Sequence, residues 1–461
     1  MSKNRSDTVD GLSFDRIKKI CESAGAKIHF VGIGGVSMYS LARLVINKGA
    51  AVSGSDRESS LRTERLSRMG AQICIGHSAD NVVGKDLVVY SHAIDKENPE
   101  LACAERLGIP SVGRDRLLGA LMLDYRRRIG VSGSHGKSTT VAILDRIFSY
   151  AGANPTVLSG AELPFGDSMR EGGDELLIYE ACEYRDSFLR FSPTVALGLN
   201  LELDHTDYFE SLSAIKASFA KALGRASDLA IICGDDPNLR DILSEFNCRQ
   251  LTFGFGAGND YRYFITNFRQ GGFDFSLSRF GGEIYRFSLN IPGSFNVMNA
   301  AAAITVAVEL GIDFETISSA ISDFPGIARR LQYVGDFHGS SVYYDYAHHP
   351  TEIRAAIDAL KSSSAERIAV VFKPHTYSRT KALWEDFCGA LSMADSLIVT
   401  EVYAAREEPI EGISGQSLAD AIDGAIFCHD GMVREILSKL SCDKIILMGA
   451  GDMEMIKNSI I

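Results

Sequence analysis

Three observations predict an α/β protein with three domains. The chain has 461 residues, which corresponds to about three domains of roughly 150 residues each. Glycine-containing turns join a short apolar strand to a helix at residues 32–35 and at residues 133–136. In the last third of the chain, short apolar strands repeatedly end in polar residues, as in an open parallel sheet. We place the domains at residues 1–124, 125–325 and 326–461, and expect the first and last to be Rossmann-like.

The composition excludes several classes of protein. The formal net charge of −12 and the pI near 5.4 argue against a nucleic-acid-binding protein, which normally presents a basic surface. Nine cysteines, an odd number without a Cys-x-x-Cys pair, indicate a reducing compartment and no structural disulfides. No apolar run approaches the ~18 residues of a membrane span, and the polar residues 1–11 lack the apolar core of a signal peptide. We therefore expect a cytoplasmic protein with no nucleic-acid or membrane partner.

The first domain is predicted to begin with a βαβ unit. A strand at residues 27–30 leads into a glycine turn, and a second strand at residues 51–53 ends in an acidic residue where dinucleotide-binding folds keep their ribose ligand. Ser37 replaces the last glycine of the nicotinamide fingerprint, which weakens an NAD site but leaves a diphosphate site at the helix N-terminus. A strand at residues 87–90 ends at the same ligand-binding edge. The residues predicted to contact a diphosphate-containing ligand at this edge are Gly32, Gly34, Gly35, Ser55, Asp56, Ser91, His92 and Ala93.

A phosphate-binding loop organises the central domain. Residues 126–150 are predicted to form a strand, a glycine turn and an amphipathic helix whose N-terminus faces an anion. We expect Lys137 to be a surface charge that packs against little and reaches the terminal phosphates of a nucleotide, while the Ser138 hydroxyl binds magnesium. The strict Walker pattern requires glycine where Val131 stands, so only the shorter G-x-x-G-K-S form is present. The candidate ATP ligands of this loop are Gly133, Ser134, His135, Gly136, Lys137, Ser138 and Thr139.

Two further strands of the central domain indicate a metal site. The strand at residues 176–179 ends in Glu180, and the strand at residues 194–201 ends before His205. The carboxyl ends of parallel strands meet at one edge, so these two side chains are predicted to meet the magnesium held by Ser138. Histidine is a less usual magnesium ligand, and both side chains could instead cap loops. The nearby carboxylates that could substitute are Glu183, Asp186 and Glu202.

The rest of the chain predicts hairpins, a helix and a second open sheet. Residues 253–290 contain short alternating segments between glycine pairs, which is typical of antiparallel hairpins. Asn296 and Asn299 precede an alanine-rich helix at residues 300–310, and could bind a base or ribose or serve as its N-cap. The polar ends of the C-terminal strands define an active edge that must face another domain. These strands are expected at residues 342–344, 368–372, 397–400 and 444–447.

Ten motifs between Ile28 and Asp452 follow the order of a known family. They are HFVGIGGVSM, VSGSD, GSHGKSTT, EACEYRDSFL, NLELDHTDYF, IPGSFNVMNA, RRLQYVG, DYAHHPTEI, KPHTYSRT and EVYAAREEP. Together they resemble the Mur ligases of peptidoglycan synthesis. The resemblance implies a UDP-sugar on the first domain, ATP and Mg²⁺ around Lys137, and an amino acid on the third domain. It further implies ATP-dependent ligation of L-alanine to the lactyl carboxylate of UDP-N-acetylmuramic acid through an acyl phosphate.

The resemblance also implies roles for individual residues. The implied catalytic set is Lys137, Glu180, His205, Arg330 and Asp345. The implied ATP site adds Asn296, Asn299, Arg330 and Asp345 to the phosphate loop, and the implied magnesium ligands are Ser138, Glu180 and His205. The implied amino-acid site contains His348, His349, His375 and Arg379. The chain departs from the family pattern at Ser37, at Ser138, in EACEY, and at Thr376, where relatives often carry an arginine that would bind a carboxylate.

Three alternatives remain open from the sequence. A sister Mur ligase that recycles whole peptides onto the sugar shares most motifs, although AHHPTEI and the modest length favour the alanine-adding reaction. A nicotinamide-dependent oxidoreductase would use the first domain, but Ser37 and the lack of a hydride-transfer site count against it. A regulatory phosphate-loop NTPase would leave the polar strand ends of the third domain unexplained. The sequence also leaves open whether the protein is a monomer or a homodimer.

Overall fold

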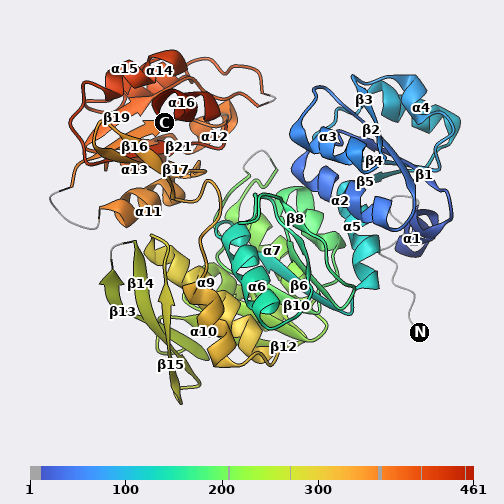
Figure 1. Ribbon diagram of the computed structural model, residues 1–461, viewed down its shortest axis with the longest axis horizontal. Coiled ribbons are helices and arrows are strands. Elements are labelled where there is room, and N and C mark those ends of the chain that lie inside the picture. The colour runs from blue at the N-terminus through green and yellow to red at the C-terminus, as the bar shows by residue number, and fades with distance from the viewer. Residues whose placement is uncertain (1–11, 206–207, 270, 362–365, 406, 452) are drawn as a thin grey trace.

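Three sheets flanked by helices form the molecule. The computed structural model describes residues 12–205, 208–269, 271–361, 366–405, 407–451 and 453–461. Figure 1 shows the first lobe in blue and the C-terminal lobe in orange to red, both above the central lobe. The predicted α/β class is confirmed. In the described ranges, no helix combines the length and apolar character needed to cross a membrane. The expectation for residues 1–11 lies outside the described residues.

The first sheet is entirely parallel, in the order β3-β2-β1-β4-β5. Chain order reverses between β1 and β4, and ligands of open α/β sheets bind at the carboxyl ends of strands beside such a switch point. The strands are β1 (Lys27–Val31), β2 (Ala51–Asp56), β3 (Gln72–Ile75), β4 (Leu87–Tyr90) and β5 (Ser111–Gly113). The helices are α1 (Phe14–Glu22), α2 (Val36–Asn47), α3 (Leu61–Arg68), α4 (Pro99–Leu107) and α5 (Arg114–Leu121).

The central sheet has the order β15-β14-β13-β12-β11-β10-β6-β9-β7-β8, with β6 between β10 and β9. The antiparallel pairs β13–β14 and β14–β15 confirm the hairpins predicted at residues 253–290. Its strands are β6 (Arg127–Ser132), β7 (Thr156–Leu158), β8 (Met169–Arg170), β9 (Leu176–Glu180), β10 (Val195–Gly198), β11 (Leu229–Cys233), β12 (Arg249–Gly254), β13 (Tyr261–Arg269), β14 (Gly272–Arg279) and β15 (Ile284–Leu289). Its helices are α6 (Lys137–Tyr150), α7 (Leu212–Leu223), α8 (Pro237–Ile242), α9 (Ser294–Glu309) and α10 (Phe314–Ser322).

The C-terminal sheet has the order β16-β17-β21-β18-β19-β20 and is parallel except for β16 at its edge. Its strands are β16 (Gln332–Phe337), β17 (Ser340–Asp345), β18 (Ile368–Phe372), β19 (Ser396–Val399), β20 (Ile426–Phe427) and β21 (Lys444–Met448). Its helices are α11 (Pro350–Leu360), α12 (Tyr377–Ala382), α13 (Trp384–Leu391), α14 (Gly415–Asp420), α15 (Val433–Leu437) and α16 (Glu454–Ile460). All four predicted strands of this domain are present.

The packing between lobes is of two kinds. One continuous group of buried apolar side chains extends through the first and central lobes. The C-terminal sheet has separate apolar clusters. Its described contacts with the central lobe include ion pairs and hydrogen bonds, such as Thr351 Oγ1 to Glu202 Oε2 at 2.9 Å and Arg379 Nη2 to Asp204 Oδ1 at 3.1 Å. Polar contacts of this kind can be exchanged for water, so the C-terminal lobe is the lobe most suited to move.

Candidate active site

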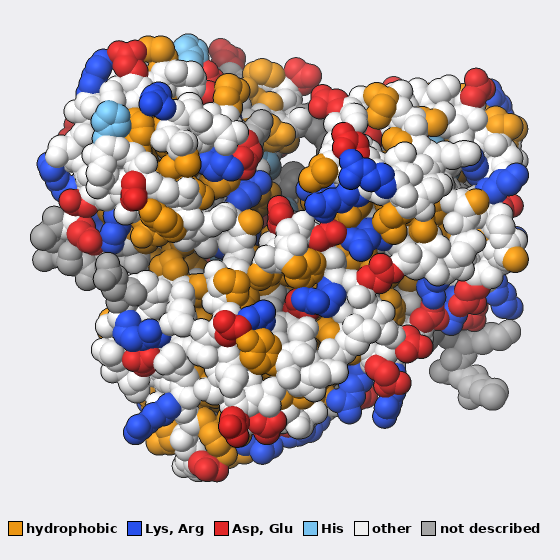
Figure 2. All heavy atoms as spheres, viewed as in Figure 1, with side chains coloured by type: hydrophobic (Ala, Val, Ile, Leu, Met, Phe, Trp, Pro, Cys, Tyr) orange, Lys and Arg blue, Asp and Glu red, His pale blue; other side chains and the backbone are white. Residues whose placement is uncertain are grey.

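A cavity of about 680 Å³ lies where the three lobes meet. Figure 2 shows the surface hollowed between the C-terminal and first lobes, with basic side chains on the rim. The cavity is lined by Arg62 and Arg65 from the first lobe, by the phosphate loop from the central lobe, and by Arg330 and His348 from the C-terminal lobe. We call it the central cavity.

The phosphate loop has the predicted strand-turn-helix form. α6 begins at Lys137, and Gly136 is its N-cap with φ +85°. A Cβ at Gly136 would lie 2.4 Å from Oδ1 of Asn299, so the backbone conformation and the available space both require glycine. On the other side, the backbone N–H of His135 donates to Oδ1 of Asn200 at 2.8 Å. The loop is therefore fixed from two sides, with the N-terminus of a 14-residue helix at the cavity.

Lys137 forms a buried ion pair. Its Nζ lies 3.0 Å from Oε2 and 3.1 Å from Oε1 of Glu183, and it also donates to the carbonyl of Gly133. The Lys137 side chain is 15% exposed and that of Glu183 only 1%. Burial by itself lowers the pKa of a lysine, but the Glu183 carboxylate outweighs it and raises the pKa of Lys137. The expectation that Lys137 packs against little is wrong, because its side chain is mostly buried and paired with Glu183. A bound phosphate would therefore compete with Glu183 for the Lys137 ammonium group.

The predicted magnesium ligands Ser138, Glu180 and His205 all line the central cavity. Oε1 of Glu180 accepts hydrogen bonds from Ser159 Oγ at 2.9 Å and from Gly160 N at 2.6 Å. Nε2 of His205 lies 3.7 Å from Oε1 of Glu183, so this carboxylate, foreseen only as a substitute, belongs to the group. A hydroxyl and two carboxylates are the oxygen donors that Mg²⁺ prefers.

Asn296 and Asn299 lie behind the phosphate loop. They occupy the first turns of α9 and are 3% and 1% exposed. Nδ2 of Asn299 donates to Oδ1 of Asn296 at 3.2 Å, so they share a face as predicted. The N-cap alternative is wrong, because α9 begins earlier than predicted and Gly293 is its N-cap. The Asn299 side chain lies directly behind Gly136, and Asn296 holds Asn299 through this hydrogen bond.

Arg330 and Asp345 flank the C-terminal side of the cavity. Arg330 lines it, with Nη1 3.6 Å from Oε1 of Glu352. Asp345 is 5% exposed and accepts hydrogen bonds from the backbone N–H groups of Leu331 and Ala347, each at 2.6 Å. Burial raises the pKa of Asp345 to about 6. In this state Asp345 fixes the backbone beside Arg330.

A second cavity of about 370 Å³, the first-domain cavity, lies at the carboxyl ends of β1 and β4. Six of the eight candidate sugar-nucleotide ligands line it, namely Gly32, Gly34, Gly35, Asp56, Ser91 and Ala93. The other two lie behind it: the buried Ser55 donates to Oε2 of Glu100 at 2.6 Å, and Nε2 of His92 lies 3.1 Å from Oδ1 of Asp115. Ser60 lines both cavities, so they adjoin at the N-terminus of α3.

Four residues were predicted to bind the amino acid. Among the described residues that line the central cavity, His348 is the one that belongs to this set. Its ring is buried, which lowers its pKa to about 3. Arg379 donates to Oδ1 of Asp204 at 3.1 Å, and its Nη1 lies 3.2 Å from Nδ1 of His375. Asp204 itself lines the cavity, so Arg379 and His375 stand directly behind it. The ring of His349 instead faces His135 and Glu202.

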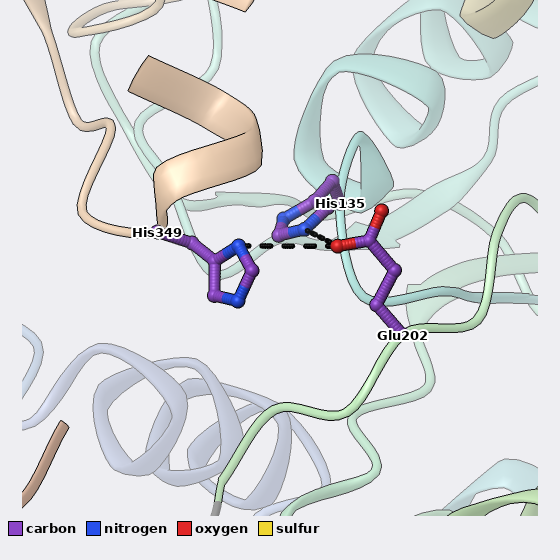
Figure 3. Close-up of side chains that lie close together, drawn as sticks. All are labelled: His135, Glu202 and His349. Atoms are coloured by element: carbon purple, nitrogen blue, oxygen red, sulfur yellow. Dashed lines mark ion pairs between the residues drawn. The ribbon is translucent and has the colours of Figure 1, made fainter. Parts of the chain in front are cut away.

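His349 lies beside His135 and Glu202 (Figure 3). Oε2 of Glu202 is 3.5 Å from Nε2 of His135 and 3.9 Å from Nδ1 of His349. On its other side, Nδ1 of His135 lies 3.1 Å from Oε1 of Glu352. Burial by itself lowers the pKa of His135, but the two carboxylates outweigh it and raise this pKa to about 9. The group therefore joins the phosphate loop to the N-terminus of α11.

The sequence did not indicate several charged residues of the cavity. Arg62 and Arg65 lie on α3, where a single sequence does not distinguish a ligand from a solvated charge. Asp204 directly precedes His205 in the NLELDHTDYF motif, and no role was predicted for it. Glu352 lies between His135, His348 and Arg330. Its only sequence signal was the i,i+4 spacing from His348 within DYAHHPTEI.

Three family models match successive parts of the chain. The Mur ligase family catalytic domain matches residues 27–126, the Mur ligase middle domain residues 131–307, and the Mur ligase glutamate ligase domain residues 329–451. The chain belongs to the Mur ligase family. This confirms the resemblance and removes the oxidoreductase and the regulatory NTPase as alternatives.

Curated and solved relatives of this Mur ligase cover nearly its whole length. The UDP-N-acetylmuramate--L-alanine ligase of Alkaliphilus metalliredigens is 39% identical over 94% of this chain and 96% of its own. That of Caldanaerobacter subterraneus is 42% identical over 86% of this chain and 87% of its own. The solved UDP-N-acetylmuramate-alanine ligase MurC of Thermotoga maritima superposes with a TM-score of 0.79 at 28% identity, covering 94% of this chain and 98% of that one. A murein peptide ligase from Psychrobacter arcticus shares the fold, with a TM-score of 0.72 at 24% identity over 95% and 98% of the two chains.

Proposed function

We propose that this Mur ligase joins L-alanine to the lactyl carboxylate of UDP-N-acetylmuramic acid in an ATP-driven step of peptidoglycan precursor synthesis. The observation that carries the proposal is the central cavity, which is lined by side chains from all three lobes. A reaction that brings a nucleotide, a nucleotide sugar and an amino acid together needs such a meeting point. The names of the relatives at about 40% identity support alanine as the amino acid.

ATP would bind with its phosphates at residues 133–139, which include the N-terminus of α6. Ser138, Glu180 and His205 would hold Mg²⁺, with Glu183 as a further carboxylate. When bound, Mg²⁺ neutralises charge on the phosphates. The Nζ of Lys137, now paired with Glu183, would turn to the transferred phosphoryl group.

The UDP-sugar would occupy the first-domain cavity, with its diphosphate at the N-terminus of α2 behind Gly35. Because Ser60 lines both cavities, the sugar can extend past α3 into the central cavity. Arg62 and Arg65 supply positive charge along this route.

The proposed chemistry overcomes the poor electrophilicity of a carboxylate. The lactyl carboxylate attacks the γ-phosphoryl group while Lys137 and Arg330 offset charge on the transferred group. The bond from the γ-phosphorus to the bridging oxygen breaks, ADP leaves, and an acyl phosphate forms. The alanine amine then attacks the activated carbonyl, and the tetrahedral oxyanion collapses to amide and phosphate. Arg379, His348 and His375 would orient alanine through its carboxylate, which requires Arg379 to share or leave Asp204. Closure of the C-terminal lobe would exclude water from the acyl phosphate.

The domain boundaries are proposed at residues 124/125 and 325/326. The three sheets lie within residues 27–113, 127–289 and 332–448, and the family matches within 27–126, 131–307 and 329–451. Both observations support the first boundary to within about ten residues. The second boundary lies in the interval 307–329 that the family matches leave open.

Phosphate release from ATP tests the proposed function. It should require UDP-N-acetylmuramic acid and L-alanine together, and the product should have the mass of the amide. Phosphate release at the full rate without the sugar would contradict the ligase proposal. Faster turnover with the tripeptide L-alanyl-γ-D-glutamyl-meso-diaminopimelate than with alanine would instead identify the peptide-recycling ligase.

A further inference from the structure

The group formed by His135, Glu202 and His349 has the composition of a transition-metal site. Two imidazoles and one carboxylate are the protein ligands of many zinc sites that keep a fourth position open. One nitrogen or oxygen from each residue lies within 4.8 Å of the others, with separations from Glu202 of 3.5 and 3.9 Å. Ligands about 2.0–2.2 Å from a tetrahedral zinc lie about 3.3–3.6 Å apart, so small side-chain adjustments suffice.

The inward-facing nitrogens, Nε2 of His135 and Nδ1 of His349, are the atoms that can bind a metal ion. Because the two carboxylates raise the pKa of His135, metal binding would release the proton from its Nε2. Nδ1 of His135 faces the Glu352 carboxylate at 3.1 Å and therefore carries a proton. Its Nε2 is buried without a hydrogen-bond partner and faces Glu202. A carboxylate behind a histidine is the arrangement that orients metal-binding histidines.

A hydrogen bond also fixes the tautomer of the His349 ring. Its Nδ1 accepts a 3.3 Å hydrogen bond from the backbone N–H of Thr351, which places the ring proton on Nε2. The same Nδ1 faces Glu202, so a metal bond would replace this long hydrogen bond. The His349 residue is 6% exposed, whereas the Glu202 side chain is 37% exposed and provides an entry path from solvent.

We propose that His135, Glu202 and His349 form a binding site for Zn²⁺ or a similar transition-metal ion between the central and C-terminal lobes. This site is separate from Ser138, Glu180 and His205, the residues proposed for Mg²⁺. It joins the phosphate loop to the N-terminus of α11, so a bound ion fixes the C-terminal lobe against the loop. The proposal does not depend on the identity of the amino acid substrate.

Cobalt titration of the full-length, metal-free protein without nucleotide tests this site. We expect one tight equivalent of Co²⁺ with the visible spectrum of a tetrahedral site and no thiolate-to-metal band in the near ultraviolet. A thiolate band at the first equivalent would assign the ion to cysteines and overturn the proposal. Zn²⁺ should displace the Co²⁺ and quench its spectrum.

Two variants remove different ligands while keeping local structure. His349→Asn removes an imidazole but keeps a side chain that caps α11 well, and Glu202→Gln preserves shape. Loss of an outer-shell partner costs about 10–100-fold in metal affinity, so loss of a ligand should cost at least about 100-fold in each variant. Wild-type affinity in either folded variant would contradict the proposal.

Two control variants separate this site from other histidines and from the magnesium site. His429 and Glu401 form an exposed ion pair without a second imidazole, so His429→Asn should leave Co²⁺ affinity unchanged. Ser138→Ala should also leave it unchanged. If Ser138→Ala abolished Co²⁺ binding, the ion would belong to the nucleotide site, and the proposal would fail.

Discussion

At the scale of single residues, Lys137 has two partners at different stages of the proposed reaction. Its Nζ pairs with the 1%-exposed Glu183 in this state and would pair with phosphate during turnover. Lys137→Ala should therefore abolish ligation and also lower the free energy of unfolding by about 3 kcal/mol or more, because it leaves a buried carboxylate unpaired. Calorimetry and turnover assays measure the two effects.

The double variant Lys137→Ala/Glu183→Gln is the control for this prediction. Removing the orphaned charge should recover most of the stability without restoring turnover. Unchanged stability in the single variant would show that the ion pair contributes little.

Arg379 is the residue that should set the affinity for the amino acid. It lies at 3.1 Å from Asp204 and 3.2 Å from His375, behind the cavity wall. Arg379→Lys retains the charge but not the planar fork that binds a carboxylate through two hydrogen bonds. A lost charge-assisted contact of about 1.5–3 kcal/mol should raise the KM for alanine about 10- to 100-fold and change that for ATP little. An unchanged alanine KM would remove Arg379 from the site.

At the scale of elements, the turn between β6 and α6 depends on Gly136. Gly136→Ala places a Cβ 2.4 Å from Oδ1 of Asn299 and puts alanine at φ +85°, so we expect ATP affinity to fall at least about tenfold. Gly152→Ala, at the other end of α6, has φ +77° and open space. Each variant should lose about 1–2 kcal/mol of stability from left-handed strain, but only Gly136→Ala should lose ATP affinity in calorimetric titration. Equal ATP affinity in both variants would show that the loop tolerates the clash.

The β2–α4 contact of the first lobe depends on the buried Glu100. It accepts hydrogen bonds from Ser55 and Asn81 at 2.6 Å and contacts His77 at 2.9 Å. In addition, Oε1 of Glu100 lies 3.4 Å from Nε2 of His29. Burial by itself raises the pKa of Glu100, but His29 and then these hydrogen-bond partners outweigh it and lower the pKa to about 2. Because the folded pKa is below the ordinary value, the stabilisation is present above about pH 4.5 and lost as the pH falls towards 2.

Glu100→Gln tests this contact. The stability difference from wild type should be about 1.5–3 kcal/mol at pH 7 and smaller at pH 4. Glu64→Gln, on the exposed face of α3, is the matched surface control and should have little effect at either pH. Equal Glu100→Gln differences at both pH values would contradict the role of the charge.

The sequence predicted local structure better than contacts between distant residues. The start of α6 at Lys137 and the strand β4 were predicted to the residue, because a glycine turn and a short apolar run are local signals. β10 ends at Gly198, earlier than predicted, and the following apolar residues form a loop. The partner of Arg379 lies 175 residues away and that of His135 lies 217 away. No periodicity specifies such pairs, which depend on how the lobes are placed.

At the scale of the whole molecule, the first and central lobes share one apolar core, whereas the C-terminal lobe has its own. Among the described residues, Phe295 packs against that separate core, and hydrogen bonds and ion pairs add to this junction. This division suits a cycle in which the C-terminal lobe opens to admit substrates and closes to exclude water. The central claim is that the three substrates react in one cavity through an acyl phosphate.

The most direct test uses UDP-N-acetylmuramic acid labelled with ¹⁸O in both oxygens of its lactyl carboxylate. Activation by ATP should transfer one labelled oxygen to each phosphate released, and the amide product should keep the other. Mass spectrometry of both products reads the outcome directly. Phosphate without label, formed together with the amide, would contradict the acyl phosphate and with it the central claim.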